Sequence, residues 1–309
     1  MQTKFSVEIG KLKLNNPVLA ASGTFGYAEE FKDFMDLRKL GAIVTKTLTL
    51  KPRQGNPAPR TCETPAGLLN SIGLENPGLE IFIRDKLPFL KKIGIPIIMS
   101  IASEEESSEF LELVSRINMI KEVAAVELNI SCPNVRGRSN LISQDAEATY
   151  KIVQEVRKIT GKVLITKLSP NVTSIGVIAE AAEKAGSDAV ALINTLGGMS
   201  IDVEQRKPKV AAGIAGLSGP AIRPVAIRMV WEVFNRVKIP IIGMGGIMDV
   251  SSALEFIIAG ATAVSIGTAN FINPKISAEI VSGLKEYLTR NKIADIQDLT
   301  GSLKICSQR

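Results

Sequence analysis

Eight short apolar runs, rich in Val, Ile and Ala, recur along the chain with longer segments of helical period between them. The runs are Pro17–Ala21, Ala42–Lys46, Pro96–Ile101, Val123–Ile130, Lys162–Leu168, Asp188–Ile193, Pro240–Gly243 and Ala263–Gly267. Such alternation is typical of parallel β/α units, in which each strand is followed by a helix. Eight units within 309 residues predict an α/β fold in which residues 1–309 form a single (β/α)8 TIM-barrel domain.

The segments between the runs predict the surrounding elements. Helices are expected over Glu104–Ile120, Ala221–Val237 and Asp249–Ala259, where apolar residues share one face. The opening residues, Phe5–Leu14, alternate in polarity around Gly10, which predicts an N-terminal hairpin that closes the barrel bottom.

Two segments are too long to be tight connections between a strand and a helix. They are Thr47–Glu75, whose four prolines and three glycines predict a loop, and Thr195–Pro220. Long insertions at the carboxyl face of a barrel typically build the binding site or an interface, and we expect that role for both.

Composition argues against several classes of protein. Cys62, Cys132 and Cys306 form no C-x-x-C pair and leave one over, so we expect no disulfide framework, no metal site and a reducing cytoplasmic location. Charged residues near the start interrupt the apolar run that a signal peptide would need, which argues against a targeting segment. The uncharged stretch Phe256–Pro274 contains many Gly, Ser, Thr and Asn residues and is interpreted as a core strand plus loop, not a membrane span.

The net charge of +6 comes from scattered Lys and Arg with three tyrosines and one tryptophan among them. Nucleic-acid binding surfaces usually cluster basic residues and interleave aromatic ones. We therefore expect a site for small anionic ligands and no nucleic-acid or membrane partner.

Small or polar residues follow several of the predicted strands. Taken singly, such a residue is usually where a strand meets solvent, but together at one end of a barrel they predict a binding site. The residues are Ala21–Thr24, Lys46–Thr47, Asn129 with Cys132, Lys167, and Asn194–Thr195.

Cys132 is the leading candidate for acid/base chemistry because the chain has no histidine. Most free cysteines are small buried hydrophobic residues. Here Asn129 and Asn134 flank Cys132 and the polar segment Arg136–Arg138 follows, which argues against simple burial.

Glycines end the seventh and eighth strands, at Gly243–Gly246 and Gly267–Thr268. Loops after these strands of a barrel frequently bind phosphate through backbone N–H groups, although glycines also serve tight turns. The chain has no Walker lysine loop and no G-x-G-x-x-G after the first strand, so the phosphate of a mononucleotide-type cofactor fits better.

Lys167 has two candidate roles. A fixed cation near N1 and O2 of a flavin stabilises its reduced form, whereas a buried lysine in a barrel aldolase forms a Schiff base. Four asparagines favour the flavin, because amides supply the donors and acceptors that hold a planar ring: Asn70, Asn129, Asn134 and Asn194.

Five motifs in the same order as in class 1 dihydroorotate dehydrogenases give the chain a resemblance to that family over nearly its whole length. They are Asn70–Leu74, Asn129–Asn134, Asn194–Thr195, Leu217–Ile222 and Ile241–Ile247. Class 2 enzymes use serine where Cys132 stands. The family often has an asparagine at the third strand, where this chain has Ser100.

The resemblance implies oxidation of (S)-dihydroorotate to orotate in pyrimidine biosynthesis, with Cys132 as the base and one FMN as hydride acceptor. It implies substrate contacts from Lys46, Asn70, Ser71, Ile72, Gly73, Leu74, Asn129, Asn194 and Thr195. It implies FMN contacts from Ser22, Lys46, Thr47, Ser100, Asn129, Lys167, Ile193, Gly219, Gly245, Gly246, Gly267 and Thr268.

The segments Gly198–Asp202, Arg206–Pro208 and Ile241–Ile247 resemble subclass B most. That likeness implies a homodimer of this chain, joined by two electron-transfer subunits with FAD and a 2Fe–2S cluster that pass electrons to NAD. Three dispersed cysteines cannot ligate such a cluster, so it would sit on the partner. The alternatives are a subclass A homodimer that reduces fumarate, a Schiff-base aldolase, and a barrel that binds or scaffolds without catalysis.

Overall fold

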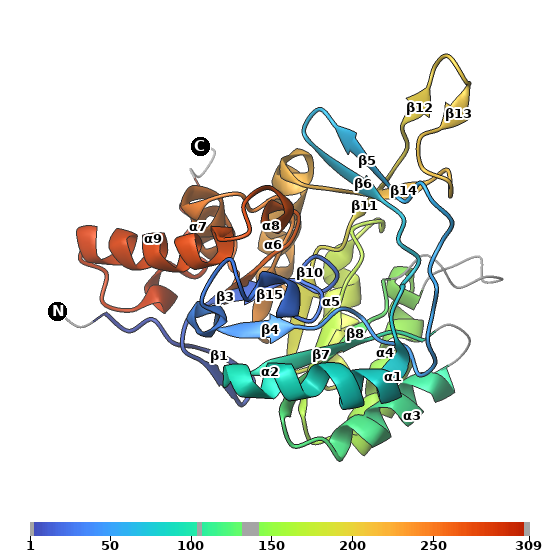
Figure 1. Cartoon of the computed structure of the whole chain (residues 1–309). Coiled ribbons are helices and arrows are strands. Elements are labelled where there is room, and N and C mark those ends of the chain that lie inside the picture. The colour runs from blue at the N-terminus through green and yellow to red at the C-terminus, as the bar shows by residue number, and fades with distance from the viewer. Residues whose placement is uncertain (1–2, 104–106, 132–141, 306–309) are drawn as a thin grey trace.

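The computed structural model describes residues 3–103, 107–131 and 142–305. Eight parallel strands close into a barrel in the order β10-β15-β16-β3-β4-β7-β8-β9, which confirms the predicted fold (Figure 1). The strands are β3 (Val18–Ala20), β4 (Ala42–Val44), β7 (Ile97–Ile101), β8 (Val123–Asn129), β9 (Val163–Lys167), β10 (Ala189–Leu192), β15 (Ile241–Gly243) and β16 (Ala263–Ile266). Each lies within or matches its predicted run.

Helices form the outer layer, and from α3 to α7 each packs against the next one, while α7 packs against α9 (Figure 1). They are α1 (Gly78–Ile81), continued by a π-helix (Phe82–Lys86) and α2 (Leu87–Ile93), then α3 (Ser107–Asn118), α4 (Ala146–Ile159), α5 (Ile175–Lys184), α6 (Arg223–Phe234), α7 (Val250–Ala259), α8 (Ala269–Ile272) and α9 (Ile276–Arg290). The three predicted helices are confirmed as α3, α6 and α7, with shorter bounds, and residues 104–106 of the first lie outside the described residues.

The expectation of a helix after every strand is wrong for the first strand. Between β3 and β4 the chain forms two short 3₁₀ helices, η1 (Glu29–Phe31) and η2 (Leu37–Lys39). Gly23, Gly26 and Ala28 adopt positive φ there, which breaks a regular helix before its first turn is complete. Phe25 and Phe31 stack with ring centroids 4.0 Å apart, so aromatic packing replaces the helix as cover for this side of the barrel.

No helix in the described part of the chain is long and apolar enough to cross a membrane. Two other 3₁₀ helices, η4 (Ile142–Gln144) and η5 (Pro220–Ile222), precede α4 and α6, and η6 (Ile296–Leu299) follows α9.

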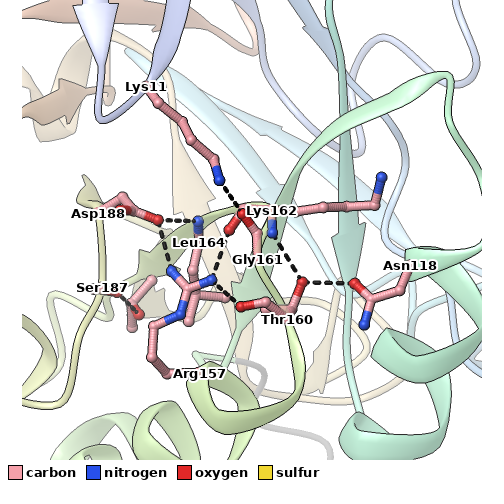
Figure 2. Close-up of polar contacts among 10 residues, drawn as sticks. Lys11, Asn118, Arg157, Thr160, Gly161, Lys162, Leu164, Ser187 and Asp188 are labelled. Atoms are coloured by element: carbon pink, nitrogen blue, oxygen red, sulfur yellow. Dashed lines mark hydrogen bonds and ion pairs between the residues drawn. The ribbon is translucent and has the colours of Figure 1, made fainter.

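An N-terminal hairpin covers the amino ends of the strands, as predicted. Strands β1 (Val7–Ile9) and β2 (Leu12–Leu14) pair antiparallel around Gly10, and Ile9 and Leu14 are fully buried. A Cβ on Gly10 would lie 2.9 Å from the Cβ of Asp188, so only glycine permits this approach. Lys11 donates from Nζ to the carbonyl oxygen of Gly161, which joins the hairpin to the loop before β9 (Figure 2).

An ion pair locks the same end of the barrel. Arg157 at the end of α4 donates to Asp188 Oδ2 at 2.8 Å, and the same oxygen accepts the backbone N–H of Leu164 at 2.8 Å (Figure 2). Arg157 also donates to the carbonyl oxygens of Thr160 and Lys162. One guanidinium therefore ties α4, the loop before β9 and the start of β10 together.

The two long insertions meet above the opposite end of the barrel, where they build one antiparallel sheet that sequence analysis missed. Its order is β11 (Leu196–Gly198), β14 (Ala215–Ser218), β6 (Gly67–Asn70) and β5 (Thr61–Thr64). The loop prediction for Thr47–Glu75 is thus only partly right. A further hairpin, β12 (Ile201–Asp202) with β13 (Lys207–Pro208), projects away from the barrel (Figure 1).

Removing the Asp188 carboxylate tests how much the Arg157–Asp188 ion pair stabilises the amino end of the barrel. Asp188→Ala deletes an acceptor of two hydrogen bonds, one of them from a charged donor, and we expect a loss of about 2–3 kcal/mol in the free energy of unfolding. Urea unfolding followed by circular dichroism measures it. Asp85→Ala is the matched control, because the Arg84–Asp85 pair is exposed and its loss is expected to have no measurable effect. Equal stability of the two variants would contradict the assigned role.

Candidate active site

A buried layer of polar side chains lies at the carboxyl ends of neighbouring strands. Asn129, the last residue of β8, donates from Nδ2 to Thr47 Oγ1 at 3.2 Å, and the Thr47 hydroxyl lies 2.9 Å from Ser100 Oγ of β7. The exposed fractions of these three residues are 7% or less. Buried polar groups need partners, and here each one supplies a partner to the next, which fixes their rotamers.

The layer continues through Ser131 to the connection after β10. Ser131 donates to Asn129 Oδ1 at 2.8 Å and accepts from Asn194 Nδ2 at 2.5 Å, and Asn194 Oδ1 accepts the backbone N–H of Thr195 at 2.8 Å. Sequence analysis did not single out Ser131, although its place between Asn129 and Cys132 was a usable signal. Cys132 and Asn134 lie outside the described residues.

Lys167 ends β9 with its side chain inside the barrel. It pairs in register with Asn129 on β8 and Ala191 on β10, and only 5% of it is exposed. Its Nζ donates to Ser22 Oγ at 3.0 Å. No carboxylate among the described residues forms an ion pair with it, so its charge is available to a ligand at the barrel mouth.

Lys46, two residues after β4, is the second cation at this end of the barrel, and it is half-buried. Its backbone N–H bonds to the carbonyl oxygen of Gly26 at 2.9 Å. Burial is the main cause that lowers the pKa of Lys46 from its ordinary value, and Arg60 lowers it too, while Glu75 and Glu30 oppose the shift. A bound anionic ligand would stabilise the charged form of Lys46, because a nearby opposite charge offsets the free-energy cost of removing the ammonium group from water.

The segment Asn70–Leu74 is held by backbone-directed hydrogen bonds. Asn70 Nδ2 donates to the carbonyl oxygen of Gly216 at 3.3 Å, across the sheet that joins the two insertions. Asn56 donates to Ser71 Oγ at 2.7 Å and to its carbonyl oxygen at 3.1 Å, and the Asn56 N–H bonds to the carbonyl of Ile72. Gly73 and Leu74 both adopt positive φ, so the segment turns sharply.

Arg60 locks this turn from outside. Its guanidinium donates to the carbonyl oxygens of Asn56 and Gln54 and forms an ion pair with Glu75. Sequence analysis missed Asn56, Arg60 and Glu75, because their partners are loop backbone atoms that no periodicity reveals.

Three glycines let the loops after β14 and β15 approach one another. Gly219, Gly245 and Gly246 all have positive φ. A Cβ on Gly246 would lie 2.7 Å from the carbonyl oxygen of Gly219, and one on Gly245 would lie 3.2 Å from Ile193 Cγ1. Only glycine fits both the conformation and the space, so the backbone itself forms the surface there.

The end of β16 joins this group of glycines. Thr268 donates to Ser218 Oγ at 2.8 Å, and Ser218 donates to the carbonyl oxygen of Leu68 at 3.2 Å. Gly267 faces Ala21, and a Cβ there would lie 3.9 Å from that residue. Exposed backbone beside two hydroxyl groups is the kind of surface that binds a phosphate.

The described residues predicted for the site thus fall into three adjoining parts. The polar layer holds Ser22, Thr47, Ser100, Asn129, Lys167, Asn194 and Thr195, with Lys46 beside it. The glycine-rich part holds Ile193, Gly219, Gly245, Gly246, Gly267 and Thr268, and the turn above them is Asn70, Ser71, Ile72, Gly73 and Leu74. A fixed cation, planar amides and a backbone anion site together suit a flat, phosphate-bearing ligand.

Comparison with known proteins gives this arrangement a family. The family model described as "Dihydroorotate dehydrogenase" matches residues 4–288. A protein of Trichlorobacter lovleyi named "Dihydroorotate dehydrogenase B (NAD(+)), catalytic subunit" is 54% identical over 98% of this chain and 100% of its own length. A protein of the same name from Thermoanaerobacter pseudethanolicus is 51% identical over 97% and 98%.

Among solved structures, the crystal structure of DHODH from Eimeria tenella in complex with ferulenol matches with a TM-score of 0.80. The match covers 97% of this chain and 88% of that one at 22% identity. At this identity the likeness concerns the fold alone.

The electrostatics of Lys46 can be tested directly by NMR titration of labelled lysine side chains. We expect Lys46 to titrate below the ordinary value of 10.5, since burial disfavours its charge, and Glu75→Gln to lower its pKa further. Lys151 is the internal control, because its bond to Glu147 on the surface raises its pKa. A Lys46 that titrates with or above Lys151 would refute the assigned environment.

Proposed function

The chain belongs to the dihydroorotate dehydrogenase family, and we propose that it oxidises (S)-dihydroorotate to orotate in pyrimidine biosynthesis with FMN as cofactor. The observation that carries the proposal is the convergence of Lys167, the amide layer around Asn129 and the glycine turns at one end of the barrel, in a chain that the family model matches almost throughout. When bound, FMN accepts the hydride that leaves C6 of the substrate.

The described residues fit this cofactor. Lys167 supplies a fixed positive charge for the electron-rich edge of a reduced flavin, and Ser22 holds its ammonium group in place. Asn129, Thr47 and Ser100 supply amide and hydroxyl groups within one bonded chain. Gly245, Gly246 and Gly267 with Thr268 offer backbone to the phosphate, as in many barrels.

Substrate binding is assigned to Lys46, to asparagines of the polar layer and to the turn above it. Lys46 pairs with the substrate carboxylate, and we assign the amides of Asn70, Asn129 and Asn194 to the ring edges. Arg60, through its bonds to Asn56 and Glu75, holds the turn Asn70–Leu74 in place before the substrate binds. Little further conformational entropy of the turn is then lost on binding.

Cys132 is proposed as the base that removes the proton from C5 of the substrate. The thiolate is the reactive form of a cysteine, and an unperturbed thiol has a pKa of about 8.5. The Ser131 hydroxyl, fixed between Asn129 and Asn194, immediately precedes it in the chain and ties this point of the backbone to the polar layer.

Membership in this family argues against a Schiff-base aldolase and against a barrel without catalytic activity.

For the electron acceptor we propose NAD, reached through a separate subunit with FAD and a 2Fe–2S cluster. Relatives that are 50% identical or more are named as NAD(+)-type catalytic subunits, a name that implies another subunit. We propose a homodimer of this chain joined by two such partners, acting in the cytoplasm. Met199, Ile201 and Val203 are more than half exposed on and beside the β12–β13 hairpin, which supports contact with another chain. Subclass A chemistry with fumarate is the alternative.

The primary test is the colour of the purified protein. We expect a yellow flavin spectrum that bleaches when dihydroorotate is added without oxygen, and one FMN per chain after extraction. A colourless protein that neither holds FMN nor takes it up would refute the proposal.

Cys132→Ala separates the base from the cofactor site. FMN is expected to remain bound and to be reduced by dithionite, whereas reduction by dihydroorotate slows by on the order of a hundredfold or more, because proton removal loses its catalyst. Stopped-flow absorbance measures both reactions. Cys62→Ala is the matched control, since Cys62 lies half-buried on β5. Equal rates in both variants would remove Cys132 from the role of base.

Turnover with alternative acceptors separates the two subclasses. The chain alone is expected to reduce neither NAD nor fumarate efficiently. The complex isolated with its electron-transfer subunit is expected to reduce NAD, because electrons would pass singly through the cluster to FAD, which can deliver a hydride to NAD. Light scattering of the complex should give two copies of each subunit. Rapid fumarate reduction by the isolated chain would favour subclass A.

A further inference from the structure

Glu127 is a buried carboxylic acid that the proposed mechanism does not use. It lies on β8, two residues before Asn129, and only 1% of it is exposed. Its Oε1 atom has no hydrogen-bond partner among the described residues. Buried acids of this kind are rare, because taking a carboxyl out of water without a partner costs free energy.

Strand register places this carboxyl inside the barrel. Side chains alternate along a strand, so Glu127 faces the same way as Asn129, whose amide belongs to the polar layer. Glu127 pairs with Ser100 on β7 and with Ile165 on β9, and Ser100 bonds to Thr47 in that layer. Glu127 therefore lies one inward position before Asn129 on β8, level in register with Ser100 of the layer.

Apolar and small residues surround this position, so packing alone would favour an apolar side chain. The inward neighbours in register are Ser100 on β7 and Ile165 on β9 and, one step lower, Ala125 and Ile98. A leucine or methionine there would avoid the desolvation cost. Costly buried polar residues concentrate where function requires them.

Lys167 is a buried cation on β9, the strand next to β8. It pairs with Asn129, so Glu127 and Lys167 occupy neighbouring strands at successive inward positions. Strand geometry puts their Cα atoms about 8 Å apart. No salt bridge between the two is found among the described residues, and two charges in a water-excluded interior would interact over such a distance with little screening.

We propose that Glu127 is a positioning residue that sets the reduction potential of the bound flavin by opposing the charge of Lys167. The inference rests on the proposed function, because it requires FMN at the barrel mouth. The proposal includes an ionised Glu127 carboxyl, whose negative charge would limit the preference of Lys167 for the electron-rich reduced flavin. The reduced cofactor then gives up its electrons more readily to the next acceptor.

The test is a potentiometric titration of FMN bound to Glu127→Gln, with dithionite as reductant and no dihydroorotate present. Loss of the negative charge is expected to raise the ratio of reduced to oxidised flavin, at a fixed potential, on the order of tenfold. Glu127→Asp retains the charge and is expected to match the wild type. Ser265→Ala is a neutral control, since Ser265 on β16 is also buried with an unpartnered hydroxyl.

Stability supplies the second measurement. Because the carboxyl costs free energy in this site, the apoprotein of Glu127→Gln is expected to be at least as resistant to urea as the wild type. A variant that unfolds would show that the fold requires the carboxylate and would overturn the proposal. An unchanged flavin ratio in Glu127→Gln, or an equal change in Ser265→Ala, would overturn it too.

Failure of the broader proposal gives a different result. A wild-type protein that takes up no FMN would refute the proposed function and, with it, this inference. A wild-type protein that binds FMN and bleaches with dihydroorotate, beside an unchanged ratio in Glu127→Gln, would refute the inference alone.

Discussion

The closed ring of parallel strand pairing is the constraint on which the other features depend. Once eight strands are hydrogen-bonded in register, each side chain must face either the helices or the barrel interior, and its height is fixed. Asn129 and Lys167 meet because they are register partners at the ends of β8 and β9. The hairpin and the Arg157–Asp188 pair fix the strands at the amino end of the barrel. Because the strands are paired in register, these contacts also help to fix the positions of side chains at the carboxyl end.

The mouth of the barrel is unusual in its electrostatics. Lys167 is buried there and Lys46 is half-buried. Glu75 forms an ion pair with Arg60, and Glu127 lies one inward position before Asn129 on β8. Free energy that would otherwise be gained by ion pairing inside the protein is left for an anionic ligand. This arrangement explains why the burial that lowers the pKa of Lys46 is tolerated.

Much of the fold and site was accessible from sequence because it depends on local signals. Apolar runs marked every barrel strand, and the residues just after them, such as Lys46 and Asn194, marked the site. The remainder depends on contacts between distant segments. The missing first helix follows from left-handed turns at Gly26 and Ala28, which composition alone does not reveal. Arg60 and Asn56 act on backbone oxygens, and Glu127 looks like an ordinary surface acid until register places it inside.

The sheet shared by the two insertions limits how such a barrel can evolve. Asn70 and Gly216 are joined across 146 positions of sequence, so the sheet above the barrel mouth belongs to neither half of the barrel. If half of the barrel were exchanged between relatives, the eight strands could still close into a ring. The two insertions would then come from different proteins, and β6 and β14 would have to pair without having evolved together. The two insertions therefore have to change together, although each follows a different strand of the barrel.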